Sequence, residues 1–240
     1  MPLLAAAGVA AGAALQSATG FGFSMVAAPL VFAAVGAPEA VGLMIVLGAE
    51  VNLLTLLTER RRPRPDVREC AVLLAWAVPG AIAGVAVLRA LDEVTLQIAV
   101  SVGVVATLAA RRLASGRRTP RWAAPVAGTV TGALTTSTTT AGPPLLVYLL
   151  GRGHDPERFR DTLTVCFLAL CPIGAAALWV TGTDAVPEAT LLATLVPLVA
   201  VGHLAGRPVF ARLARAGSYE PVLTAVLLAA VVVGLAGATL

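Results

Sequence analysis

Long apolar segments dominate the pattern of hydrophobic and polar positions along this chain. A membrane-spanning helix needs about twenty apolar residues, and the continuous candidates are residues 40–58, 70–88, 94–110, 162–180, 188–206 and 221–240. Two more apolar segments, 3–35 and 122–150, are interrupted near their centres by polar and Gly-rich residues. The pattern predicts an all-α polytopic membrane protein.

The two interruptions are related to each other. Shifting residues 7–22 by 120 positions gives seven identities in sixteen, where an Ala- and Gly-rich composition would give roughly two by chance. A further match at a shift of 122 aligns Gly80 with Gly202 and Gly84 with Gly206. We infer two homologous halves, residues 1–118 and 119–240, which together form a single integrated membrane domain.

Composition supports the membrane interpretation. Hydrophobic residues make up 58% of the chain and charged residues 12%, whereas a soluble domain carries about a quarter charged residues. The start of the chain lacks the positive flank of a cleaved signal peptide. The three cysteines show no metal-ligand spacing, so we expect packing roles for them and neither a metal site nor a cofactor.

Arginine provides every basic residue, and its distribution constrains topology. If all eight apolar segments cross the membrane, ten arginines lie on one side of it and seven on the other. If 3–35 and 122–150 are re-entrant, 16 of the 17 arginines lie on one side, as the positive-inside rule favours. The limbs 3–16 and 122–136 reach only about 22 Å, short of a core of about 30 Å. We therefore predict inverted repeats, each with one re-entrant segment and three spans; eight simple spans with parallel repeats stay the alternative.

Breaks at matched positions of two halves are typical of a transport site. Each break leaves backbone N–H groups unpaired at the positive end of a half-helix, which attracts an anion. The candidate substrate-binding residues are Gln16, Ser17, Thr19, Gly20, Gly22, Ser137, Thr139, Thr140, Gly142 and Pro143. The competing interpretation is that these small and hydroxyl residues only let helices pack closely.

A carboxylate in the middle of a predicted span is a second functional candidate. Glu50 lies within 40–58, two residues before Asn52. An intramembrane carboxylate is costly and often carries a proton, so we consider Glu50 and Asn52 candidates for coupling transport to a proton or cation. The alternative is a protonated Glu50 that hydrogen-bonds a neighbouring helix.

Three segments resemble a known family. The segments Gly12–Leu30 and Gly132–Leu150, and the sequence at 158–162 before an apolar span, are similar to the sulfite exporter TauE/SafE family of bacterial membrane transporters. The resemblance implies export of small anions, such as sulfite, sulfonates or related organic anions, by a multi-pass protein of the bacterial cytoplasmic membrane. A homodimer is compatible with it.

The function expected is a secondary transporter with alternating access around the paired breaks, whose partners are a small anion and the lipid bilayer. A nucleotide-binding loop of the Gly-x4-Gly-Lys-Ser/Thr type is absent from the sequence. An anion channel that uses the same breaks is the alternative. We expect no enzymatic activity, because no convincing Ser–His or multi-His constellation is present, and no nucleic-acid partner, because the arginines lie in short loops between apolar spans.

Overall fold

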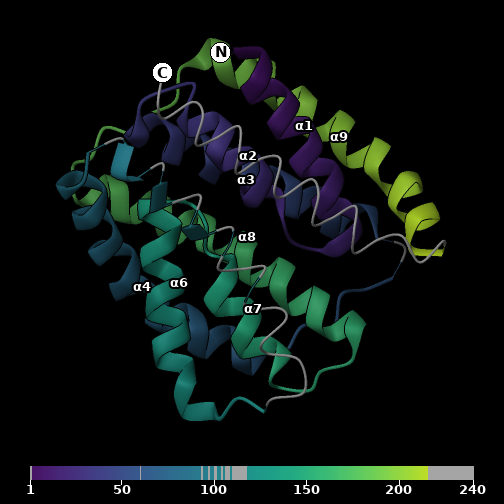
Figure 1. Cartoon of the computed structure of the whole chain (residues 1–240). Helices are drawn as coiled ribbons and strands as arrows, with labels where there is room; N and C mark the ends of the chain where they lie inside the picture. Colours follow the sequence, from purple (N-terminus) through teal and green to yellow (C-terminus); the bar gives the residue numbers. More distant parts are fainter. Residues whose placement is uncertain are drawn as a thin grey trace.

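The computed structural model describes residues 2–59, 61–92, 94–96, 98–99, 102–103, 105, 109 and 118–215, and the structural statements below concern these residues. They form helices joined by short connections, with no strand among the residues described (Figure 1). The helices with their bounds are α1 (Pro2–Thr19), α2 (Phe23–Phe32), α3 (Ala37–Thr58), α4 (Val67–Ala90), the 3-10 helix η1 (Arg121–Ala123), α6 (Ala124–Ser137), α7 (Gly142–Leu150), α8 (Pro156–Val180) and α9 (Ala189–Arg215). The predicted all-α class is confirmed.

Four helices are long and apolar enough to cross a membrane. They are α3, α4, the part of α8 over Glu157–Val180 and the part of α9 over Ala189–Pro208. Each coincides with a span predicted from hydropathy. The predicted span 94–110 is described only in part, and 221–240 lies outside the described residues. The chain is therefore a multi-pass membrane protein.

Each predicted interruption separates two short helices that form a hairpin. Gly12 of α1 lies against Phe23 and Gly8 against Leu30, so α1 and α2 run antiparallel. In the second hairpin the backbone N–H of Thr119, just before η1 and α6, donates to the carbonyl of Gly151, just after α7, at 2.9 Å. At 1.5 Å per residue the fourteen residues of α6 and the nine of α7 extend about 21 Å and 14 Å.

Close glycine contacts pack the helix before each break against a long helix. Helices α4 and α6 lie side by side, as do α1 and α9 (Figure 1). A Cβ atom on Gly84 would lie 2.1 Å from the carbonyl oxygen of Ala133, and one on Gly206 would lie 2.3 Å from that of Ala14. Only a residue without a side chain lets the backbones approach this closely.

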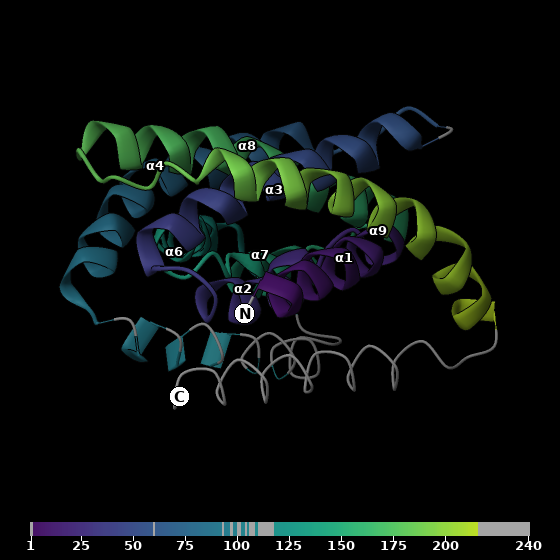
Figure 2. The same ribbon diagram turned by 90° about the horizontal axis from the view of Figure 1, so that it is seen from above.

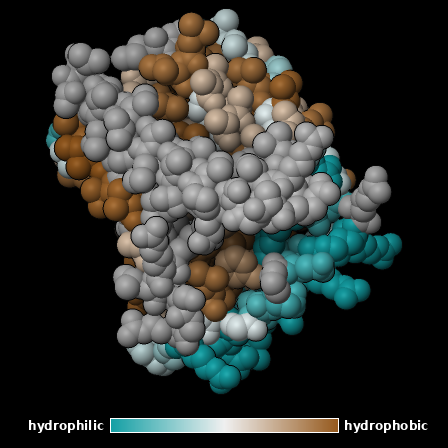
Figure 3. All heavy atoms as spheres, turned by 45° about the vertical axis from the view of Figure 1, so that its right-hand side comes forward, coloured by the Kyte–Doolittle hydropathy of each residue, from teal (hydrophilic) through white to brown (hydrophobic). Residues whose placement is uncertain are grey.

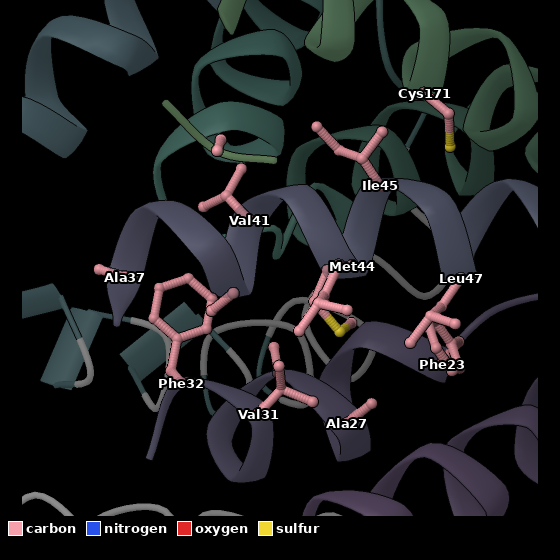
Figure 4. Close-up of a cluster of buried hydrophobic side chains, with 14 of the residues drawn as sticks. Phe23, Ala27, Val31, Phe32, Ala37, Val41, Met44, Ile45, Leu47 and Cys171 are labelled. Atoms are coloured by element: carbon pink, nitrogen blue, oxygen red, sulfur yellow. The ribbon is translucent and has the colours of Figure 1, made fainter. Parts of the chain in front are cut away.

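The breaks lie near the centre of the bundle. Seen from above, α2 and α7 are central, and α3 and α8 pass along one side of them (Figure 2). Helix α3 contacts both α2 and α8, and α7 contacts α8. A buried apolar cluster that includes Phe23, Val31, Met44 and Leu47 fills the space between α2 and α3 (Figure 4).

The outer surface carries large apolar side chains. Leu57, Trp179 and Val180 are exposed by 71%, 82% and 72%. One face shows apolar and hydrophilic residues gathered in separate regions (Figure 3). Exposed apolar side chains of this size over several helices are expected where the solvent is lipid.

Candidate functional site

A cavity lies where the two helix breaks meet. It offers about 60 Å³ to the centres of water molecules and is lined by residues of both breaks and by one face each of α3 and α8. The first break and the start of α2 contribute Gln16, Gly22, Phe23, Ser24 and Met25. The second break and its flanks contribute Thr135, Thr139, Thr140, Ala141, Gly142 and Pro143. Two segments about 120 residues apart in sequence thus meet at one site.

Two glycines with left-handed backbone form the first break. Gly20 has φ of 77° and Gly22 has φ of 108°, a conformation that glycine adopts at little cost. The N–H of Gly20 donates to the carbonyl of Gln16 at 2.8 Å, and α2 begins at Phe23. Helix α1 can therefore end, and the chain can reverse, within four residues.

The buried side chain of Gln16 fixes the geometry of this break. Its Oε1 accepts a hydrogen bond from the N–H of Phe23 at 3.1 Å, and its Nε2 donates to Oδ1 of Asn52 on α3 at 2.8 Å. Asn52 in turn donates to the carbonyl of Gly48 at 2.7 Å. Gln16 thus caps the start of α2 and attaches the break to the face of α3 that lines the cavity.

The first turn of α2 borders the cavity. Within the first turn of a helix the N–H groups have no intrahelical acceptor. Gln16 satisfies that of Phe23, and the N–H of Val26 reaches the carbonyl of Gly22 at 3.4 Å. Ser24 and Met25, which both line the cavity, belong to this first turn and so lie at the positive end of the helix macrodipole, where an anion is favoured.

The second break offers hydroxyls more than amides. Pro143 and Pro144 occupy the first turn of α7, as proline does readily, and they carry no N–H. Thr139 has φ of 56°, which is rare for a β-branched residue. Its Oγ1 is buried, and no hydrogen-bond partner for it occurs in the described part of the chain. The hydroxyl of Thr138, by contrast, pairs with that of Thr140 at 2.7 Å.

Several predicted binding residues lie beside the cavity and do not line it. The hydroxyls of Ser17 and Ser137 donate to the carbonyls of Ala14 and Ala133, each at 2.8 Å, within their own helices. Gly20 packs against the side chain of Arg160. The side chain of Thr19 lies outside the described residues. The predicted residues that share the cavity wall are Gln16, Gly22, Thr139, Thr140, Gly142, Pro143 and Asn52.

Glu50 is on another face of α3. It is two residues from both Gly48 and Asn52, or about 200° around the helix, and it is not among the lining residues. Its Oε2 is buried, with no hydrogen-bond partner among the described residues. Its coupling role stays a prediction.

Sequence reasoning missed the apolar wall of the cavity. This wall comes from α3 and α8 and comprises Met44, Ile45, Phe167, Leu170 and Cys171. Residues 44, 48 and 52 of α3, like 167 and 171 of α8, are four apart and therefore share a helix face. That spacing was visible in the sequence, but on a helix buried on several sides it does not reveal which face meets a cavity.

Ion pairs connect α8 to the loop that follows α3. Arg61 binds Asp161 through two hydrogen bonds of 2.7 and 2.9 Å, and the hydrogen bond to Asp161 raises the pKa of Arg61 above its ordinary value. Arg160 pairs with Glu59 at 2.7 Å and donates to the carbonyl of Ser17 at 3.1 Å. The α8 start is thereby fixed against the end of α1.

A buried carboxylate near the start of α4 is satisfied in a similar way. Glu69 accepts a hydrogen bond from the hydroxyl of Tyr148 at 2.5 Å and pairs with Arg152 at 2.8 Å. The charge of Arg152 is therefore balanced locally.

An all-helical membrane protein with two helix breaks around a cavity lined by polar and apolar residues has the architecture of a transporter. Comparison of the sequence with known families shows a match to the model of the sulfite exporter TauE/SafE family over residues 4–236. The chain belongs to this family, whose members are membrane transporters. No curated protein and no solved structure matched.

Proposed function

We propose that this protein is a secondary transporter that exports small anions, such as sulfite, sulfonates or related organic anions, across the bacterial cytoplasmic membrane. The observation that carries the proposal is the convergence of both breaks on one cavity. Alternating access around this cavity would expose it to one side of the membrane at a time.

The halves 1–118 and 119–240 act as inverted repeats in this mechanism. In these repeats α1 corresponds to α6, α2 to α7, α3 to α8 and α4 to α9. The contact between α4 and α6 therefore corresponds to the contact between α9 and α1, and the contact between α3 and α8 joins two corresponding helices. The glycines matched by sequence, Gly84 and Gly206, each meet the helix before the other half's break. This exchange symmetry supports two equivalent end states, one for each side of the membrane.

The two hairpins are re-entrant in this proposal. Both return the chain toward where it entered, and α2, α6 and α7 are shorter than the roughly 30 Å hydrocarbon core. The side chains of Arg158 and Asp66 are 3.2 Å apart, which places the start of α8 beside the start of α4. Labelling of cysteines introduced next to Arg64 and Arg158 should report the same side of the membrane, and labelling from opposite sides would favour eight simple spans.

The anion is held by dipoles at the two breaks. The N–H groups of Ser24 and Met25 supply donors from the first half, and the hydroxyl of Thr139, which has no partner among the described residues, supplies one from the second. Because donors come from both halves, movement of one half relative to the other would change the affinity of the site. That coupling between conformation and binding is what alternating access requires.

Glu50 and Asn52 supply the coupling to a proton or cation. Asn52 lines the cavity and bonds Gln16, while Glu50, two residues earlier on the same helix, has one buried oxygen with no partner in the described structure. Protonation would remove the cost of the buried charge and so bias the position of α3.

An anion channel is the second candidate, because the same donors could line a conducting path. Flux measurements in proteoliposomes separate the two. A transporter gives saturable flux and accumulation of the anion against its own gradient when a proton or cation gradient is imposed. Flux proportional to the driving force with no accumulation would identify a channel, and no flux of any of these anions would reject the proposed function.

A further inference from the structure

The two helices that precede the breaks end in different surroundings. The last carbonyls of a helix have no intrahelical donor, and the macrodipole makes that end negative. At the end of α1, the carbonyl of Ser17 accepts a hydrogen bond from the guanidinium of Arg160 at 3.1 Å. The matched residue, Ser137, ends α6, and no donor to its carbonyl or to that of Thr136 occurs among the described residues. A cationic side chain therefore serves the first break, and no described one bonds the second.

The sequences of the two long helices explain this difference. Arg160 lies in the first two turns of α8, where its pairing with Glu59 at 2.7 Å also holds it. Helix α3 corresponds to α8 in the repeat and contains neither Arg nor Lys, so it offers the second break no equivalent cation. Arg152, which follows α7, is engaged by Glu69 at 2.8 Å. The negative end of α6 thus lacks the counterpart of Arg160.

Oxygen atoms gather at this end of α6. Thr139 is exposed by only 7%, and its hydroxyl oxygen is buried without a hydrogen-bond partner in the described part of the chain. The hydroxyls of Thr138 and Thr140 are 2.7 Å apart. Thr135, Thr139 and Thr140 all line the cavity. Hydroxyl and carbonyl oxygens are the ligands that hard metal cations prefer.

Backbone donors are scarce on the α7 side of the same break. Pro143 and Pro144 occupy the first turn of α7 and have no N–H, so this break offers an anion fewer donors than the first. The start of a half-helix favours an anion, and the end of one favours a cation. The hydroxyl of Thr139 is suited to both ions, because its oxygen has two acceptor lone pairs besides the O–H.

The chemistry of these oxygens indicates the class of cation. No lining residue that the structure describes has a formal charge, whereas sites for Ca²⁺ and Mg²⁺ depend on carboxylates. Hydroxyl and carbonyl oxygens do not titrate near neutral pH, so a proton has its candidate site at Glu50 and not here. These oxygens suit a monovalent metal cation.

We propose that the second break binds an alkali cation, Na⁺ or K⁺, at the end of α6 through the carbonyl oxygens of Thr136 and Ser137 and the hydroxyl oxygen of Thr139. The cation takes the place that the guanidinium of Arg160 has at the first break. Its part in transport rests on the proposed function, whereas its binding is measured without any substrate anion.

The experiment titrates cations into the purified full-length protein in detergent. N-methylglucamine chloride is exchanged for NaCl or KCl at constant ionic strength and constant chloride, so that only the cation changes. We expect a saturable calorimetric signal with Na⁺ or K⁺ and a Tm that rises with the concentration of the bound metal. N-methylglucamine, an organic cation too large for the break, should give neither effect.

Two variants locate the cation at Thr139. Thr139→Val removes the hydroxyl but keeps the branched shape at φ of 56°, and it should weaken cation binding by about tenfold or more. Thr139→Ser retains the hydroxyl and should bind within about threefold of the wild type. Thr194→Val is the matched control, because the exposed hydroxyl of Thr194 bonds only the carbonyl of Thr190 on its own helix. It should leave binding unchanged.

The wild-type titrations decide the inference even where a variant fails to fold. Identical behaviour in NaCl, KCl and N-methylglucamine chloride would overturn the cation site and leave an anion transporter in place. Unchanged binding by folded Thr139→Val would likewise overturn the assignment to this break. Cation binding by a protein that moves none of the proposed anions in vesicles would instead keep the site and remove the proposed function.

Discussion

Gln16 holds together the first break and α3, so its replacement should destabilise the protein in a way that depends on Asn52. Gln16→Met keeps the length of the side chain and removes both hydrogen bonds. The buried N–H of Phe23 loses its acceptor at 3.1 Å, and Oδ1 of Asn52 loses its donor at 2.8 Å. Two buried polar groups are left unpaired.

Each buried unpaired group costs about 1–3 kcal/mol, so Gln16→Met should lower the free energy of unfolding by about 2–6 kcal/mol. The lower end applies where water in the cavity replaces the lost partner. Asn52→Leu leaves only Nε2 of Gln16 without its partner, at a cost of about 1–3 kcal/mol. The double variant leaves only the N–H of Phe23, again about 1–3 kcal/mol. The double variant should therefore be no less stable than Gln16→Met alone.

The assay is thermal unfolding of the purified protein in detergent, followed by tryptophan fluorescence. For a chain of this size about 1 kcal/mol shifts the Tm by roughly 2–4 °C, so Gln16→Met should lower the Tm by at least about 4 °C. Ser17→Ala is the control, because its hydroxyl bonds only its own helix, and it should change stability by less than about 1 kcal/mol. Equal Tm values for Gln16→Met and Ser17→Ala, or additive losses in the double variant, would refute the shared hydrogen bond.

Three other predictions test the packing and the coupling. Gly84→Val should prevent stable folding, because its Cβ would lie 2.1 Å from a carbonyl oxygen, whereas Gly48→Ala should be tolerated at 3.8 Å from its nearest neighbour; equal yields of folded protein in size-exclusion chromatography would contradict this. Copper phenanthroline should join Cys70 to Cys166, whose sulfur atoms are 3.3 Å apart, and mass spectrometry that finds no cross-linked peptide would contradict the α4–α8 contact. Glu50→Gln should weaken the pH dependence of transport in proteoliposomes, since an amide cannot exchange the proton; an unchanged pH profile would assign Glu50 a structural role.

The helices and their interruptions were predictable because they depend on local properties of the chain. Hydropathy located the spans that became α3, α4, α8 and α9, since the bilayer requires a continuous apolar length. The glycines at 20 and 22 marked the first break, and both adopt the left-handed conformation. Proline at 143 and 144 marked the start of α7.

The partners of individual side chains were not predictable in the same way. Ser17 and Ser137 occupy matched positions in the two breaks, yet their hydroxyls bond carbonyls of their own helices. Gln16 and Asn52, 36 residues apart, meet because α1 packs against α3. A hydroxyl that bonds its own helix and one that faces a cavity look alike in sequence. Which of the two occurs depends on how the helix is rotated about its axis relative to its neighbours.

The sequence alone determined that this is a helical membrane protein with two breaks, because apolar length, glycine and proline act through the backbone within a few residues. Tertiary structure alone decided that the breaks share one cavity, that apolar residues of α3 and α8 line it beside Asn52, and that Glu50 is not among the lining residues. Those features depend on which faces of distant helices pack together. The close contacts of Gly84 and Gly206 help to set that packing, and the sequence does not show which helix each glycine meets.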